Sequence, residues 1–126
     1  VEGQGSILHP SYSGVTYGLL HGSLPHAQVL CHQPSRRAIA RQEWVPIPPL
    51  AELVRMYEAA AAPLRPAPVI AIALNTFDLS DDEARAAIRR AEAETGLPAT
   101  DPVRYDPAPI VDAITRFHAS RTAAAR

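Results

Sequence analysis

The fold of this chain is decided by the stretch Pro68-Val69-Ile70-Ala71-Ile72-Ala73-Leu74 and by residues 80–96 that follow it. The first part is a continuous apolar run without the alternation of a half-exposed strand, which predicts a strand buried on both faces. In the second part Ser80 and Glu83 have the spacing of a capping box, and Gly96 stands where a helix would end. A helix is therefore predicted over residues 81–95, directly after a buried strand.

The alternation of strand and helix extends to both sides of this stretch. A short apolar run predicts a strand inside the sheet at residues 27–32. Apolar residues recur at helical spacing from Leu50 to Tyr57, which predicts a helix that starts near Pro48-Pro49 and ends before Pro63. Shorter elements are expected as a helix capped by Ser13, a polar surface connection at 33–49, an edge strand within 98–103, a helix from Pro107 or Pro109, and a frayed tail from Ser120. We predict one α/β domain over residues 1–126, with a mainly parallel sheet and helices on both faces.

Composition excludes several classes of partner. The net charge of -1 gives no general attraction to nucleic acid or to an anionic membrane. No apolar run is long enough to cross a bilayer, and no leader is present, so we expect a cytoplasmic protein. All 12 basic residues are arginine, so a Walker A lysine cannot come from this chain. The single Cys31 excludes an internal disulfide, and its apolar neighbours predict a buried thiol.

The chain begins with a glycine-rich turn, Val1-Glu2-Gly3-Gln4-Gly5-Ser6. Such a turn normally follows a buried strand, of which only Val1 would remain, so we expect the downstream part of a larger domain whose amino-terminal part is missing. Backbone amides of Gly3, Gln4, Gly5 and Ser6 are suited to bind a phosphate or a developing oxyanion. Glu2 would hold Mg²⁺ or orient an amine; the alternative is a plain tight turn with an exposed Glu2.

Other polar residues are candidates for chemistry or binding. His9 is either a general base or a partner of its own loop backbone. Ligands of parallel sheets gather at the carboxyl ends of the strands, where Glu2, His32 and Asn75-Thr76 fall. Asn75 either reads a nucleotide base there or is a turn residue. Asp101 and Arg104, near the next strand end, either line the same crevice or pair with each other. The histidines lack metal-ligand spacing, so no histidine metal site is predicted.

The opening run, followed by His9-Pro10 and Ser13-Gly14-Val15-Thr16, resembles the signature of a bacterial family known as domain-of-unknown-function family 1611. Residues 73–76 and 96–104 fit the same pattern, so the resemblance covers nearly the whole chain. Characterised members of that family are D-glutamate N-acetyltransferases. The resemblance implies a P-loop-like domain, here incomplete because the phosphate-binding loop is absent.

By this resemblance the chain would be part of an enzyme that transfers an acetyl group from acetyl-CoA to the amine of an acidic D-amino acid, and it would be inactive as this fragment alone. Glu2 or His9 would accept the amine proton, and the amides from Gly3 to Ser6 would stabilise the oxyanion. The expected substrate-binding residues are Ser13, His32, Arg36 and Arg104. The expected nucleotide-binding residues are Asn75, Thr76 and Asp101.

Two other functions stay open at this point. The Glu-Gly-x-Gly turn also resembles that of dethiobiotin synthetase, which implies an ATP- and Mg²⁺-dependent ligase or small-molecule kinase in which Glu2 binds the metal. A non-catalytic interaction module is the third possibility. In each case exposed sheet edges would favour association, so a homo-oligomer is a possible state.

Overall fold

The computed structural model describes residues 1–3 and 6–124. The chain divides into two compact units, which are described separately. The first contains residues 1–28 and 36–68, and the second contains residues 29–35 and 69–126. The single domain that the sequence predicts over residues 1–126 stays a prediction.

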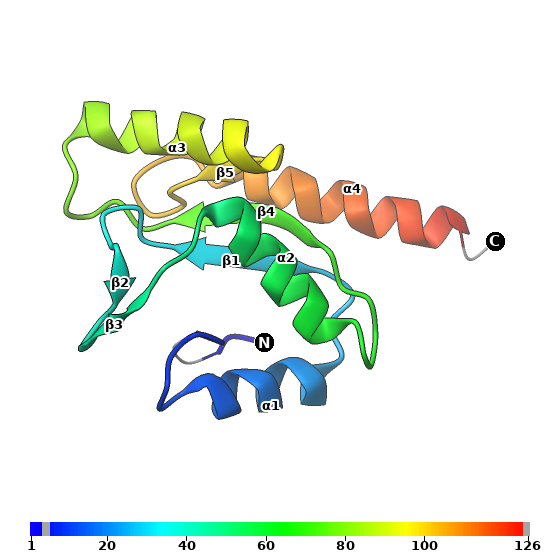
Figure 1. The fold of residues 1–126 in the computed structure, drawn as a ribbon. Helices are drawn as coiled ribbons and strands as arrows, with labels where there is room; N and C mark the ends of the chain where they lie inside the picture. The colour runs from blue at the N-terminus through cyan, green and yellow to red at the C-terminus, as the bar shows by residue number, and fades with distance from the viewer. Residues whose placement is uncertain (4–5, 125–126) are drawn as a thin grey trace. The chain divides into compact units, whose positions relative to one another are not determined.

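The second unit contains a three-stranded sheet (Figure 1). Its strands are β1 (Gln28–His32), β4 (Val69–Leu74) and β5 (Ala99–Thr100), in the order β1-β4-β5. β4 pairs in parallel with β5, with Ile72 opposite Ala99. The apolar run that predicted β4 is its central strand, and Ala71 and Ile72 are completely buried. The expected α/β fold with a parallel sheet is confirmed.

Two helices pack against this sheet: α3 (Asp81–Thr95) against β5, and α4 (Ala108–Ala124) against β4 and β5. Figure 1 shows α3 in yellow-green after the loop that leaves β4. The helix begins with the predicted capping box of Ser80 and Glu83 and ends at Gly96, which has a left-handed backbone with φ of 70°. Its alanines Ala84, Ala87 and Ala91 are buried, so small side chains face the core.

The first unit contains two helices and a hairpin. Helix α1 (Ser13–Ser23) follows the amino-terminal loop, and α2 (Leu50–Ala61) buries Leu50, Leu53, Ala60 and Ala61. The hairpin consists of β2 (Ala38–Ile39) and β3 (Gln42–Pro46), which pair antiparallel. Arg41, in the hairpin turn, has a positive φ of 62°.

Several local expectations are wrong. Residues 33–49 contain the β2–β3 hairpin instead of an irregular connection, because two short segments pair across a turn. Tyr12, not Ser13, occupies the N-cap position of α1, and α4 continues through Ala124 instead of fraying from Ser120. In the described part of the chain β1 lies at one end of the sheet and not inside it.

The expected burial of Cys31 is also wrong, since this side chain is exposed. Burial alternates along β1, where Leu30 is buried while Val29 and Cys31 are exposed. Only one face of β1 is therefore covered, and Cys31 lies on the other.

Candidate functional site

The candidate site of the second unit lies where its strands end. His32 is the last residue of β1, Asn75 and Thr76 follow β4, and Asp101 follows β5. The Asn75 backbone N–H donates to the His32 carbonyl oxygen at 2.9 Å, which joins the first two strand ends. Parallel pairing therefore brings these predicted residues to one edge, as the sequence argument required.

Thr76 and Asp101 form a buried polar pair, with relative exposures of 0% and 3%. Oδ2 of Asp101 accepts both the backbone N–H of Thr76 at 2.9 Å and its hydroxyl at 2.6 Å. Oδ1 of Asp101 accepts the backbone N–H groups of Val103 and Arg104, each at 3.0 Å. Burial opposes ionisation of Asp101, but these hydrogen bonds outweigh it, and the pKa of the carboxyl lies below its usual value.

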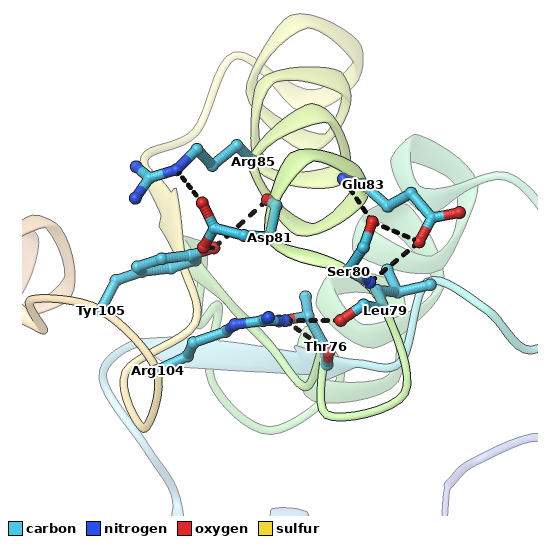
Figure 2. Close-up of polar contacts among 8 residues, drawn as sticks. All are labelled: Thr76, Leu79, Ser80, Asp81, Glu83, Arg85, Arg104 and Tyr105. Atoms are coloured by element: carbon cyan, nitrogen blue, oxygen red, sulfur yellow. Dashed lines mark hydrogen bonds and ion pairs between the residues drawn. The ribbon is translucent and has the colours of Figure 1, made fainter.

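Arg104 returns from the β5 side to the loop that follows β4 (Figure 2). Its Nη1 donates to the carbonyl oxygens of Thr76 at 3.0 Å and Leu79 at 2.8 Å. The guanidinium therefore binds backbone carbonyls, and the Arg104 bond to the Asp101 carboxylate is made by the backbone N–H. Arg104 is itself exposed, so the rest of its guanidinium remains accessible to solvent.

A second set of contacts joins the same segment to the start of α3. Tyr105 donates its hydroxyl to Oδ1 of Asp81 at 2.6 Å, and Arg85 binds Oδ2 of Asp81 at 2.8 Å (Figure 2). Arg85 also lies over the Tyr105 ring, 4.7 Å from its centre. The hydrogen bond from Tyr105, followed by that from Arg85, lowers the pKa of Asp81, and the same bond raises the pKa of Tyr105. Sequence reasoning missed Tyr105, although the spacing of Asp81 and Arg85 signals an ion pair.

Asn75 presents an exposed carboxamide beside these buried contacts. Its Oδ1 accepts the backbone N–H of Phe77 at 3.3 Å, a local turn in which the side chain braces the loop. Phe77 is 76% exposed, and sequence reasoning passed over it. The position of Phe77, two residues after the asparagine that follows the strand, was the sequence signal that could have pointed to it.

His32 is half-buried. Burial lowers the pKa of its imidazole, an effect that the charge of Glu94 partly opposes. The lowered pKa favours the neutral imidazole, which can both donate and accept a hydrogen bond.

In the first unit the amino-terminal loop is held by its own polar groups. Oγ of Ser6 accepts the Leu8 N–H at 2.9 Å, and Nδ1 of His9 accepts the Ser11 N–H at 3.1 Å. His9 also packs on Tyr12, with ring centres 4.5 Å apart. Since Nδ1 acts as the acceptor, the proton of a neutral His9 ring lies on Nε2.

The remaining predicted residues of this unit are placed as follows. Glu2 and Gly3 are exposed, Ser13 is the first residue of α1, and Arg36 is exposed before the hairpin. Gln4 and Gly5 lie outside the described residues. The chemical roles predicted for all these positions, in both units, stay predictions.

Residues 1–3 and 6–124 contain neither a cluster of metal ligands nor a helix suited to span a membrane. No group of three or more His, Cys, Asp or Glu side chains is arranged to hold a metal ion in that part of the chain. None of its helices combines the length and the apolar character that crossing a lipid bilayer requires.

Residues 1–111 match the family described as the domain of unknown function (DUF1611_C) P-loop domain. The chain belongs to this family. A crystal structure of a DUF1611 family protein from Anabaena variabilis shares 42% sequence identity with this chain and superposes with a TM-score of 0.86. The match covers 91% of this chain and 34% of the Anabaena chain. The P-loop-like α/β fold expected from the sequence is therefore that of the family.

Two relatives carry a functional name. A D-glutamate N-acetyltransferase from Tritonibacter scottomollicae is 40% identical over 119 residues, which are 90% of this chain and 34% of the relative. A D-glutamate N-acetyltransferase from Pseudoalteromonas sp. is 35% identical over 105 residues, covering 82% of this chain and 32% of the relative. The DUF1611 chain thus spans about a third of the length of these relatives.

Proposed function

We propose that this chain is part of an acetyl-CoA-dependent N-acetyltransferase that acts on an acidic D-amino acid such as D-glutamate. The observation that carries the proposal is the 40% identity to a D-glutamate N-acetyltransferase over 90% of the chain. The exposed carboxamide of Asn75 at the end of the central strand supports it, because a carboxamide donates and accepts hydrogen bonds as the edge of an adenine ring requires.

In the proposed reaction the amine nitrogen of the amino acid attacks the thioester carbonyl carbon of acetyl-CoA. The new C–N bond forms, the carbonyl oxygen becomes an oxyanion, and the C–S bond then breaks to release CoA. The ammonium group of the substrate loses two protons overall, of which the CoA thiolate takes up one and water receives the other. Backbone amides of Gly3, Gln4, Gly5 and Ser6 are the proposed donors to the oxyanion.

Glu2 is the preferred proton acceptor in this proposal, ahead of His9. The Nδ1 lone pair of His9 is occupied by the Ser11 N–H, so a neutral His9 offers a donor at Nε2 instead of a base. Arg36 is preferred over Arg104 for the substrate carboxylate, because Nη1 of Arg104 already donates to two carbonyl groups. Ser13 and His32 are proposed to add hydrogen bonds to the amino acid.

The test is a thiol-release assay on the protein that contains this chain, with acetyl-CoA and either D- or L-glutamate. Each reaction is run with and without ATP and Mg²⁺. Thiol release that requires D-glutamate and no ATP is the expected result. ATP consumption without thiol release would instead favour a ligase or kinase, and no turnover of either kind would favour an interaction module.

A further inference from the structure

Thr76 is buried and makes all its hydrogen bonds within the protein. It was predicted as a nucleotide-binding residue, but its exposure is 0%. Its N–H and hydroxyl both donate to Asp101, and its carbonyl oxygen accepts from Arg104. Every polar atom of Thr76 therefore has a partner inside the protein, so an effect of this residue on a ligand must pass through a neighbour.

The neighbour is Asn75, which is held on both sides. Its backbone N–H is fixed by the His32 carbonyl oxygen at 2.9 Å, and the following residue is fixed by the Asp101 carboxylate. Asn75 itself is exposed, unlike the buried Thr76 that follows it. The direction of its side chain is set by the backbone bonds that flank it together with its own Oδ1, which accepts the Phe77 N–H at 3.3 Å.

Asp101 connects this segment with the loop that follows β5. One carboxylate oxygen of Asp101 binds Thr76 and the other binds the N–H groups of Val103 and Arg104. The Arg104 guanidinium reaches back to the carbonyl oxygens of Thr76 and Leu79 (Figure 2). The two loops thus bind each other in both directions. Rigid support of this kind is what a binding group needs in order to keep its geometry.

We propose that Thr76 and Asp101 are positioning residues for the nucleotide end of acetyl-CoA, acting through the Asn75 carboxamide. This inference rests on the proposed function, which supplies the ligand. It differs from the sequence expectation, in which Thr76 and Asp101 touch the nucleotide themselves.

The deciding experiment is a double-mutant cycle of Thr76→Val and Asn75→Ala in the protein that contains this chain. Valine keeps the shape of threonine and removes only the hydroxyl donor. Thr76→Val is expected to raise KM for acetyl-CoA about three- to tenfold. This is less than the full contribution of one hydrogen bond to a charged group, because the effect reaches the ligand only through Asn75. The kcat at saturation and KM for D-glutamate should stay within about twofold of the original values, since uniform binding alone is lost.

The cycle separates positioning from general damage. In the Asn75→Ala background, Thr76→Val should have no further effect on KM for acetyl-CoA, because its route to the ligand is gone. Thr76→Ser keeps the hydroxyl and should restore the original KM. Thr115→Val is the matched control, since the exposed Thr115 hydroxyl donates to the Val111 carbonyl oxygen within α4.

A variant outside the core covers the case in which Thr76→Val does not fold. Arg104→Gln removes the donors to Thr76 and Leu79 from an exposed side chain, and it should also raise KM for acetyl-CoA. A rise in KM for D-glutamate alone would mean that Arg104 binds the substrate carboxylate. That result would overturn the role of the Arg104 contacts in positioning Asn75.

Calorimetric titration with CoA keeps the inference separate from the proposed function. If the original protein binds CoA but transfers no acetyl group, the proposed function fails. The positioning role is still supported if Thr76→Val weakens CoA binding in the original background and has no such effect in the Asn75→Ala background. Additive effects of the two substitutions, unchanged CoA binding in Thr76→Val, or an original protein that binds no CoA would each overturn the inference.

Discussion

The Asp101 carboxylate holds Thr76 twice through one oxygen, at 2.9 Å from the backbone nitrogen and at 2.6 Å from the hydroxyl. The other oxygen holds two backbone N–H groups of the next loop. A single buried carboxylate thus accepts four donors from the ends of two neighbouring strands. Four donors on one carboxylate favour its charged form, so we expect the charge of Asp101, and not only its shape, to stabilise this edge.

Asp101→Asn should destabilise the protein, because asparagine has one acceptor oxygen and turns an NH₂ group toward the second pair of donors. We expect a loss of about 1–3 kcal/mol in the free energy of unfolding, the range for a buried polar group left without its partner. Urea unfolding measures it. Asp112→Asn, on the exposed surface of α4, is the control and should change stability by less than about 0.5 kcal/mol. Equal effects of the two substitutions would contradict this account.

Acid should weaken the protein partly through the same group. The pKa of Asp101 is lower in the folded state than its ordinary value of about 3.9. Its contribution to stability is therefore present above that value and is lost as pH falls through the lower folded pKa. Urea midpoints measured from neutral to acid pH should fall less steeply for Asp101→Asn than for the original protein. If the urea midpoints of the two proteins fall equally steeply with pH, other carboxyl groups determine the loss of stability in acid.

The capping box of α3 should contribute independently of the site. Ser80 Oγ accepts the Glu83 N–H, and the Glu83 carboxylate accepts the Ser80 N–H at 2.9 Å. Ser80→Ala should cost about 1 kcal/mol in the free energy of unfolding, the typical effect of removing an N-cap. Ser120→Ala removes an exposed hydroxyl bound to a carbonyl within α4, and should have little effect. A similar loss from both variants would count against the cap.

The contact between Tyr105 and Asp81 can be followed by spectrophotometric titration of tyrosine. The hydrogen bond to Asp81, more than any other cause, raises the pKa of Tyr105. The titration component that disappears in Tyr105→Phe should therefore lie above the ordinary tyrosine value, and Asp81→Asn should shift it toward that value. A component that Asp81→Asn leaves in place would show that the bond does not persist in solution.

Local signals made part of this fold predictable. Helix α3 was predicted to the residue because Ser80, Glu83 and Gly96 act on their immediate neighbours. β4 was predicted because six consecutive apolar residues without alternation are typical of a strand with both faces covered. The β2–β3 hairpin was missed because its pairing depends on two short segments meeting across a turn, with Arg41 in a left-handed conformation that arginine rarely adopts.

The site was predictable only as a set of residues near one edge. Parallel strands bring His32 and Asn75 together whatever their side chains do, so that proximity followed from the alternation of strand and helix. The direction of each side chain did not follow. Whether Arg104 pairs with Asp101 or binds carbonyl groups depends on loop geometry set by residues 25–28 positions away.

The roles of Glu2 and His9 can be separated by choosing substitutions that keep the loop intact. His9→Asn places an acceptor near the position of Nδ1, so it preserves the bond from the Ser11 N–H while removing Nε2. If Glu2 takes the amine proton, Glu2→Gln should lower kcat about a hundredfold, within the range for loss of a general base, whereas His9→Asn should lower it less than about tenfold. Steady-state rates of thiol release with acetyl-CoA and D-glutamate measure both. The opposite ranking would assign the proton transfer to His9 and would require the Ser11 bond to open during turnover.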